Sequence, residues 1–231
     1  MTTALVLSGG TGTRLGADIP KQYIEVSGKP IILYCLEQLT NNEKIDAIQI
    51  VADSEWQDRI LTWLIKYDLN RKFKGFSQPG ENRQLSIFHG LECIKEYASN
   101  NDFVFIHDAA RPFLSQEMID ICIASAFGHD GAIPVLPMKD TVYLSNDGKK
   151  VSSLLNRSCI FAGQAPEIFL LGKYYEANRK LLPNEILNIN GSTEPAIMAG
   201  MDIVMISGDE KNFKITTRAD LERFQDIVKG Q

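Results

Sequence analysis

A glycine-rich segment follows the first apolar run of the chain and carries the types of residue that bind phosphates. It reads Leu7-Ser8-Gly9-Gly10-Thr11-Gly12-Thr13-Arg14-Leu15-Gly16. Glycine lets backbone N–H groups approach a phosphate closely, and turned N–H groups form a nest for anions. Arg14 and the nearby Lys21 can neutralise a triphosphate. An ordinary turn between a strand and a helix needs neither cation, so we predict a phosphate site.

The spacing of the glycines separates this segment from two common nucleotide motifs. No Gly-Lys-Ser/Thr follows, so it is not a Walker A loop. Gly10, Gly12 and Gly16 have the wrong last interval for a dinucleotide fingerprint, and no acidic residue closes a strand about 20 residues further on. A dinucleotide-dependent reductase is therefore disfavoured.

A second segment, His107-Asp108-Ala109-Ala110-Arg111-Pro112, places an acid and a base after an apolar run. Asp108 can bind a divalent ion whose remaining positions phosphates fill. Arg111 can hold a second phosphate through two N–H groups. A local ion pair between Asp108 and Arg111 explains the same residues. We expect His107 to be packed and to orient its neighbours rather than to act as a base.

Two further segments carry polar residues just before predicted helices. In residues 79–86, Gly80 can lie against a nucleobase or ribose, and Ser86 can bond a base edge; a turn with a helix cap explains them equally well. In residues 212–217, Lys214 precedes a helix start, where an anion is favoured. A solvated lysine fits that pattern too.

The candidate cations are few, and they stand in an acidic chain with a formal net charge of −5. This favours a pocket for several phosphates over a basic face for nucleic acid. No Ser–His–Asp or Cys–His set is recognisable, which argues against acyl-transfer hydrolysis. The histidines and cysteines are not clustered, so a structural metal site is unsupported, and the role of Cys159 stays open. The cations are Arg14, Lys21, Arg111, Arg157 and Lys214.

The elements that must position these residues alternate between short apolar runs and helix-period segments. Such alternation predicts an α/β fold with a mostly parallel sheet and helices on both faces. Ligands of such sheets bind outside the carboxyl ends of the strands, so residues 8–21, 79–86 and 107–112 should line one crevice. We expect strands at residues 4–7, 45–52, 103–106, 132–136 and 203–206. We expect helices at residues 29–39, from Ser54 onward, and at 87–98, 115–127 and 217–228. Two of these helices should begin with a capping box, Ser54 with Gln57 and Thr217 with Asp220.

Residues 139–159 break the alternation. Two short apolar runs, 141–144 and 151–155, surround the turn Ser145-Asn146-Asp147-Gly148, which is typical of a β-hairpin. The hairpin is too polar for a central sheet. A loose surface excursion and an arm that clasps a partner are equally consistent with the pattern.

The composition is that of a globular protein of 231 residues, with 44% hydrophobic and 23% charged residues. We expect one domain over residues 1–231. No apolar run is long enough to span a membrane, and no basic region precedes the first apolar stretch as in a secretory signal. Reduced thiols in the cytoplasm are the expectation.

In order along the chain, these segments resemble the cytidylyltransferases that load CMP onto sugar-alcohol phosphates, such as 2-C-methyl-D-erythritol 4-phosphate in isoprenoid synthesis or ribitol 5-phosphate in wall and capsule synthesis. The resemblance runs nearly end to end. It rests on the glycine segment with Pro20-Lys21-Gln22, residues 80–86 and 107–112, Lys139-Asp140-Thr141, Asn156-Arg157, Gly163-Gln164-Ala165-Pro166 and residues 212–217.

The resemblance implies a Rossmann-like nucleotidyltransferase sandwich and a homodimer whose arm, about residues 139–159, helps complete the partner's site. It implies that residues 7–14 with Lys21 hold the phosphates of CTP, and that Arg14, Lys21 and Lys214 serve catalysis. It further implies that Asp108 supports the Mg²⁺–nucleotide. The resemblance assigns the contacts to cytidine to Gly80, Glu81 and Ser86. It assigns the contacts to the second substrate to Asp108, Arg111, Thr141, Arg157, Thr193 and Lys214.

The acceptor is less well defined by the residues. The start of the glycine segment, Ser8-Gly9-Gly10, is closer to the ribitol type, whereas residues 107–112 are closer to the erythritol type, which is our first expectation. Thr193 matches the family, but Glu194 and Pro195 depart from its usual pattern. A non-catalytic nucleotide-binding module is a remote alternative, against which Arg14 and Lys21 both argue.

Overall fold

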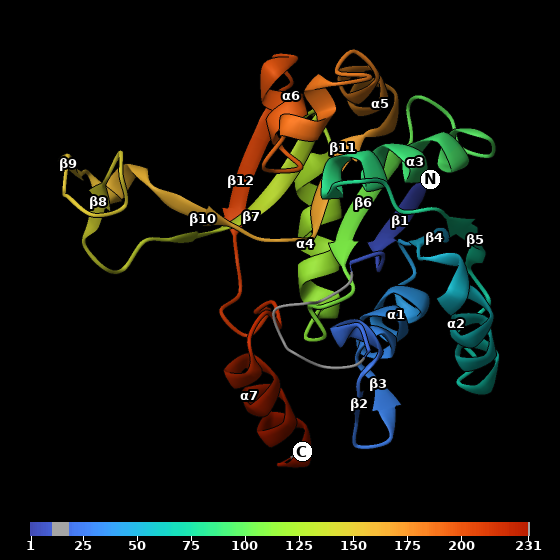
Figure 1. The fold of residues 1–231 in the computed structure, drawn as a ribbon. Helices are drawn as coiled ribbons and strands as arrows, with labels where there is room; N and C mark the ends of the chain where they lie inside the picture. Colours follow the sequence, from blue (N-terminus) through green and yellow to red (C-terminus); the bar gives the residue numbers. More distant parts are fainter. Residues whose placement is uncertain (11–18, 231) are drawn as a thin grey trace.

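The computed structural model describes residues 1–10 and 19–230 of the chain. A central sheet is covered by helices on both faces (Figure 1). Its strands are β1 (Thr2–Leu7), β4 (Ala47–Val51), β5 (Phe73–Ser77), β6 (Phe103–Asp108), β7 (Gly131–Pro137), β10 (Phe161–Gly163), β11 (Glu167–Leu170) and β12 (Ile203–Ser207). The order is β10-β7-β11-β6-β1-β4-β5, and β12 pairs with β7.

Parallel pairing dominates the half of the sheet that carries the first predicted segments. β1 is parallel to β4 and β6, and β4 is parallel to β5. β12 is parallel to β7, whereas β10 and β11 run antiparallel to their neighbours. The predicted α/β class with a mostly parallel sheet is confirmed.

The helices divide between two hydrophobic cores, one on each face. α1 (Ile31–Asn41), α2 (Ser54–Lys66) and α4 (Gln116–Ala126) bury apolar side chains against one face, and Cys35 and Cys122 are among them. α3 (Arg83–Lys95), α5 (Leu171–Arg179) and α6 (Glu194–Met198) cover the other face. Helices on both faces leave the strand ends open at the edge.

Near the C-terminus, α7 (Arg218–Lys229) packs separately from these two cores. Its buried Phe224 joins Val26 and Ile31 in a small cluster. Val26 belongs to a two-stranded ribbon of β2 (Glu25–Val26) and β3 (Lys29–Pro30). This packing ties the segment before α7, which contains Lys214, to the start of α1.

Three predicted helix starts differ from the structure, and one capping box is confirmed. α3 begins at Arg83 and ends at Lys95, whereas the prediction was residues 87–98. α2 is capped by Asp53, whose carboxylate accepts from the Glu55 N–H at 3.1 Å, so the predicted box from Ser54 is wrong by one residue. α1 begins at Ile31 rather than at residue 29, because β3 takes Lys29 and Pro30. The Thr217–Asp220 capping box of α7 is present.

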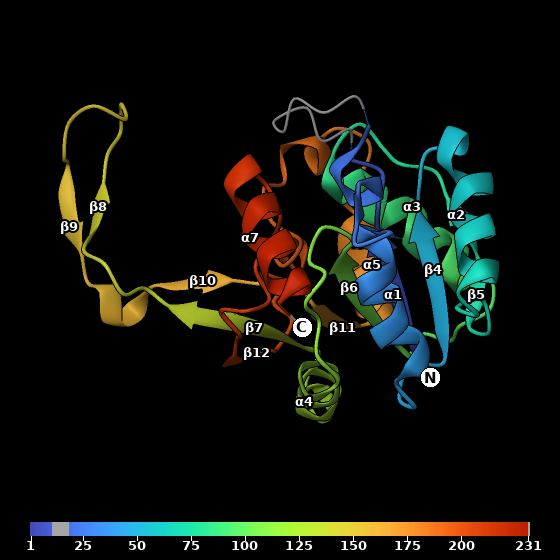
Figure 2. The same ribbon diagram turned by 90° about the horizontal axis from the view of Figure 1, so that it is seen from below.

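The predicted hairpin is present and projects from the body of the molecule. β8 (Val142–Leu144) and β9 (Ser153–Leu155) form their own two-stranded sheet, reached through β7 and β10 (Figures 1 and 2). The Asp147 carboxylate accepts from the N–H groups of Lys149 and Lys150, and Gly148 has a φ of +67° that favours glycine. We call residues 139–159 the arm.

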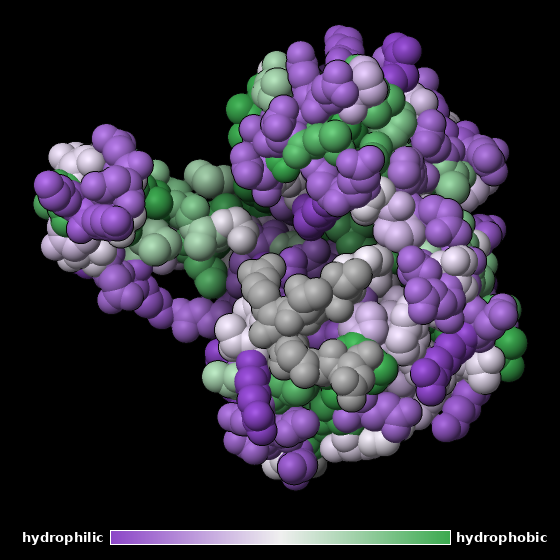
Figure 3. All heavy atoms as spheres, in the orientation of Figure 1, coloured by the Kyte–Doolittle hydropathy of each residue, from purple (hydrophilic) through white to green (hydrophobic). Residues whose placement is uncertain are grey.

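Apolar side chains lie exposed along the arm and its base, including Tyr143, Leu154 and Phe161 (Figure 3). Leu154 is 66% exposed. Elsewhere, no helix among the described residues is both long and apolar enough to cross a bilayer.

Candidate active site

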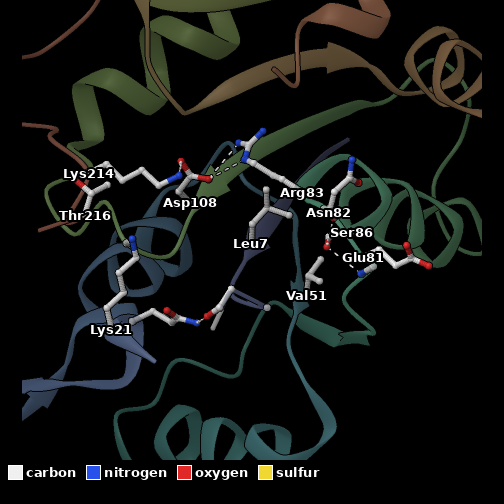
Figure 4. A pocket seen from close by; sticks show the side chains of 15 residues that line it. Leu7, Lys21, Val51, Glu81, Asn82, Arg83, Ser86, Asp108, Lys214 and Thr216 are labelled. Carbon is white, nitrogen blue, oxygen red and sulfur yellow. Dashed lines mark hydrogen bonds and ion pairs between the residues drawn. The ribbon is translucent and has the colours of Figure 1, made fainter. Parts of the chain in front are cut away.

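A crevice of about 460 Å³ opens at the carboxyl ends of the parallel strands. Its walls come from the end of β1, the segment before α3, the end of β6 and the segment before α7 (Figure 4). We predicted that residues 8–21, 79–86 and 107–112 line one crevice. This prediction is confirmed for those of these residues that the structure describes. Among the predicted site residues, the lining includes Leu7, Gly9, Gly10, Lys21, Gly80, Glu81, Ser86, Asp108 and Lys214.

One wall is the start of the glycine segment, braced by Gln22 and Tyr23. The Gln22 amide donates to the carbonyls of Ser8 and Gly10 at 2.6 and 2.8 Å. The hydroxyls of Ser8 and Tyr23 lie 2.8 Å apart, and Tyr23 stacks on Trp56. These contacts fix the backbone that leads into the crevice. Thr11, Gly12, Thr13 and Arg14 lie outside the described residues.

Glycine is required at position 9 for a steric reason. A Cβ at Gly9 would lie 2.5 Å from Cβ of Pro79, so the two walls of the crevice touch there. Lys21 begins a short 3-10 helix, Lys21–Tyr23, and its side chain extends into the crevice toward Asp108 and Lys214 (Figure 4). It is the first described cation after the glycine segment.

The opposite wall is the turn before α3, and Ser86 braces it. The Ser86 hydroxyl accepts from the Gly80 N–H at 2.9 Å and donates to the Asn82 carbonyl at 2.8 Å. Asn82 caps α3 through Leu85. Ser86 thus shapes the turn that presents the Gly80 backbone, while Glu81 lies exposed at the rim.

At the centre, three cations surround the Asp108 carboxylate, which is 6% exposed. Arg83 and Lys214 approach it at 3.1 Å (Figure 4). Arg111 lies 3.5 Å from it. Burial alone would raise the pKa of Asp108, but the neighbouring Arg83, Lys214 and Arg111 hold that pKa far below its usual range. The predicted Asp108–Arg111 pair is therefore part of a larger cluster.

Arg83 is one of the residues that our sequence analysis missed. It opens α3 inside a segment that we had considered only for contacts to the base. A cation at a helix start beside glycine was the available signal, but its partner Asp108 lies 25 positions away in sequence. The sheet order β6-β1-β4-β5, with α3 following β5, brings the two segments to one edge of the sheet.

His107 is fully buried, as expected for a packing role. One ring nitrogen, Nε2, lies 3.0 Å from the Arg111 carbonyl. Burial lowers the pKa of His107 to about 4, so the ring is neutral near pH 7 and donates that bond. The histidine thereby fixes the turn that carries Asp108 and Arg111.

Thr193 is not among the residues that line the crevice. It precedes α6, and the neighbouring Ser192 donates its hydroxyl to the Glu167 carboxylate. Glu167 begins β11 beside the end of β6, and burial raises its pKa while Arg83 opposes the shift. Sequence reasoning did not find Glu167.

Thr141 and Arg157 are not brought to this crevice. Both are exposed on the arm, which stands away from the body (Figure 2). The Arg157 guanidinium donates to the Lys139 carbonyl at 2.7 Å and braces the base of the arm. Within one chain, these two residues and Asp108 belong to separate parts of the molecule.

The described residues suit a metal ion that arrives with phosphates rather than one held by protein alone. No group of three or more His, Cys, Asp or Glu side chains that could hold an ion is found among residues 1–10 and 19–230. Asp108 is the buried carboxylate in the crevice wall. A divalent ion there would take most of its ligands from phosphate and water, as Mg²⁺ commonly does.

Comparison with known proteins places this geometry in a family. Residues 2–230 match the model of IspD, 2-C-methyl-D-erythritol 4-phosphate cytidylyltransferase. The chain belongs to the IspD family. The members of this family are CTP-dependent cytidylyltransferases.

Individual relatives of both acceptor types are similar to this IspD chain. A ribitol-5-phosphate cytidylyltransferase of Streptococcus agalactiae serotype III (strain NEM316) is 33% identical, covering 97% of this chain and 94% of the relative. A 2-C-methyl-D-erythritol 4-phosphate cytidylyltransferase of Clostridium beijerinckii is also 33% identical, covering 100% and 99%.

Solved structures agree with the family assignment. The 2-C-methyl-D-erythritol 4-phosphate cytidylyltransferase of Francisella tularensis superposes with a TM-score of 0.81 at 26% identity, covering 97% of this chain and 99% of that chain. The 4-diphosphocytidyl-2C-methyl-D-erythritol synthase of Anaerococcus prevotii gives 0.83 at 25% identity, covering 99% and 96%. The predicted nucleotidyltransferase fold is thus confirmed.

Proposed function

We propose that this IspD-family protein transfers CMP from CTP to the phosphate of a sugar alcohol, giving a CDP-alditol and pyrophosphate. The observation that carries the proposal is the cluster of Arg83, Arg111 and Lys214 around Asp108, facing the glycine segment and Lys21 across one crevice. Joining two phosphorylated substrates requires that much positive charge at one place.

The chemistry needs positioning more than a base. An oxygen of the acceptor's phosphate attacks the α-phosphorus of CTP, and the bond to the β-phosphate oxygen breaks, releasing pyrophosphate. The nucleophile is already anionic, so no proton has to be removed. Catalysis then consists of aligning the two substrates and neutralising their charge.

Each part of the crevice would have its own role in the reaction. Backbone N–H groups of the glycine segment, including Gly9 and Gly10, would hold the triphosphate, together with Arg14. The Ser8 N–H already donates to the Val51 carbonyl at 2.9 Å, so Ser8 would support the segment rather than bind phosphate through that group. Lys21 would stabilise charge that builds on the phosphates in the transition state. Gly80, Glu81 and Ser86 would frame the cytidine, with Ser86 acting through the turn it braces.

Arg111 and Lys214 would hold the acceptor's phosphate, and Asp108 would keep both cations directed into the crevice. We propose Mg²⁺ as the cofactor, with Asp108 as the nearby protein carboxylate. Bound with the triphosphate, the ion would neutralise phosphate charge.

Of the two acceptor types, we propose 2-C-methyl-D-erythritol 4-phosphate first, because the family model and the similar Francisella tularensis structure carry that name. Ribitol 5-phosphate is the second candidate, and relatives of similar identity carry the name of that enzyme. Thr193, beside the Ser192–Glu167 pair, would lie on the acceptor side of the site.

We further propose a homodimer in which the arm of one chain brings Thr141 and Arg157 to the crevice of the other. The support is the separation of these two residues from Asp108 within one chain and the exposed apolar side chains of the arm. An arm of this shape can bury those side chains against a second copy.

A pyrophosphate-release assay tests the function directly. CTP and Mg²⁺ are mixed with each alditol phosphate in turn, and ATP, GTP and UTP serve as competing nucleotides. We expect CTP to be preferred and 2-C-methyl-D-erythritol 4-phosphate to be the better acceptor. A higher kcat/KM with ribitol 5-phosphate would transfer the assignment to the second candidate, and turnover with neither would overturn the proposal.

A further inference from the structure

We propose that Gln164 and Asn212 are positioning residues that hold Lys214 and Arg111 in place for the acceptor's phosphate, an inference that rests on the proposed function. Both side chains are buried, at 6% and 1% exposure, and neither lies in the crevice wall. They join two strand ends that flank β7 to the segment carrying Lys214. We call these two side chains and their bonds the clamp.

The first half of the clamp joins the ends of β10 and β12. These strands pair with the two different edges of β7. The last residue of each strand, Gly163 of β10 and Ser207 of β12, is paired with Val135. Just past them, the Gln164 amide nitrogen donates to the Asp209 carbonyl at 3.0 Å, and the Asp209 N–H donates to the Gln164 amide oxygen at 3.0 Å. The Gln164 side chain thus exchanges two hydrogen bonds with the Asp209 backbone, as a residue of a neighbouring strand would.

Gly208 shows how closely the clamp is packed. A Cβ at this position would lie 2.5 Å from the amide oxygen of Gln164 and 3.1 Å from the Val135 carbonyl oxygen. The approach of residues 208–209 to Gln164 therefore depends on a glycine at position 208.

The second half of the clamp leads into the site. The Asn212 side chain donates to the Ala165 carbonyl at 2.7 Å. The backbone carbonyl of Asn212 accepts from the Arg111 guanidinium at 2.7 Å. Two residues later, Lys214 reaches Asp108, and the Ile215 N–H bonds the Ala110 carbonyl at 2.9 Å.

Residues 209–215 are therefore held at both ends, by the clamp at one and by the Asp108 turn at the other. The position of a flexible lysine ammonium group depends on how firmly its backbone is held. A small misplacement of such a binding group can lower the reaction rate by orders of magnitude. Loosening the clamp should shift Arg111 and Lys214 together while leaving the glycine segment and Gly80 untouched.

Three substitutions disturb the clamp in different ways. Gln164→Met removes two hydrogen bonds at nearly constant volume, Asn212→Ala removes the bond to Ala165, and Gly208→Ala forces the partners apart without removing any polar group. For each, we expect the KM for the alditol phosphate to rise about 10–100-fold. The Kd for CTP, measured by titration, should change less than about twofold.

Asn42→Ala is the matched control. Asn42 is 4% exposed and its amide also bridges two segments, bonding Gln116 and Asp120 at the opposite end of the sheet. It should lower the thermal midpoint about as much as Asn212→Ala with unchanged kinetic constants. Thermal melts of all variants identify any that fail to fold.

A double-mutant cycle separates positioning from general stability. In a Lys214→Ala background, Gln164→Met should raise the KM for the acceptor by a smaller factor than it does in the otherwise unchanged protein, because one of the two cations it positions is gone. Additive effects, or an unchanged acceptor KM in all three clamp variants, would overturn the inference. An unchanged acceptor KM in Lys214→Ala alone would instead overturn the proposed role of Lys214.

Discussion

Three cations share the carboxylate of Asp108, and they come from three places in the chain. Arg111 is three residues away, Arg83 opens α3, and Lys214 precedes α7. A buried carboxylate among cations fixes their direction before any phosphate binds. Asp108 is thus suited to arranging charge for anionic substrates, and its low pKa keeps it ionised while it does so.

Lys21→Ala should lower kcat far more than it weakens CTP binding. Backbone N–H groups and Mg²⁺ would still hold the ground-state triphosphate, whereas charge grows on the phosphorus and on the leaving pyrophosphate. Loss of one preorganised donor costs about 10²–10³ in rate. Single-turnover kinetics and a CTP titration measure the two effects. A near wild-type rate would reduce Lys21 to a lysine beside a turn.

His107 should make folding stability depend on pH below neutrality. The unfolded chain takes up a proton near pH 6.5, whereas the folded protein does so at about pH 4. Because the folded-state pKa is depressed, stability falls as the pH drops through this window, by about 3 kcal/mol. Urea unfolding at pH 7 and pH 4.5 measures the loss.

His107→Gln provides the comparison, since glutamine can donate to the Arg111 carbonyl but does not titrate. Carboxylates contribute equally to both proteins, so the difference between their pH slopes isolates the histidine. We expect a shallower slope for the variant. Equal slopes would mean that the ring is accessible to protons in the folded state.

At the scale of elements, alternation of strands and helices was enough to predict the crevice. Residues 4–7 and 103–106 were readable as strands, and parallel strands place their carboxyl ends at one edge. Contacts between distant segments were not readable: Arg83 with Asp108, Glu167 with Ser192, and Gln164 with Asp209. Each depends on the sheet order, which the local pattern does not specify.

Local competition explains the smaller errors. Asp53 and Ser54 are both good N-cap residues, and the structure uses the carboxylate of Asp53. Pro30 fits a first helical turn, but pairing with Glu25 places it in β3 instead. The antiparallel course of β10 and β11 likewise follows from the return of the arm to the sheet, which the hairpin alone did not indicate.

Shortening the arm should impair association without unfolding the body. β8 and β9 pair with each other and stand apart from the central sheet in the part of the chain that the structure describes. Replacing residues 145–149 by Asn-Gly shortens the connection between the paired residues Leu144 and Ser153 from eight residues (145–152) to five, a length that hairpins commonly use. We expect an unchanged thermal midpoint, weaker association in sedimentation velocity and lower turnover. A fully active monomer would contradict the proposed dimer.

At the scale of the whole molecule, positive charge is concentrated in an acidic protein. The net charge is −5, yet Lys21, Arg83 and Lys214 line one crevice, and Arg111 pairs with the Asp108 of its wall. The negative charge of the rest of the protein disfavours the binding of long polyanions, whereas the cations of the crevice favour the binding of small anions. Arg157 stands outside this set on the arm, and a second chain would bring it in.

Co-expression of two inactive variants tests whether sites are shared between chains. In a heterodimer of Lys21→Ala and Arg157→Ala chains, the second chain's crevice keeps Lys21 and receives an intact arm from the first, so one of its two sites is complete. Random pairing makes half of the dimers mixed, which predicts about a quarter of wild-type activity. Co-expressed Lys21→Ala and Lys214→Ala chains are the matched control, because both changes lie in the crevice and leave no complete site in any dimer. Recovery in the first mixture alone would establish that the arm serves the partner's crevice, whereas no recovery there would place Arg157 outside the reaction or within its own chain's site.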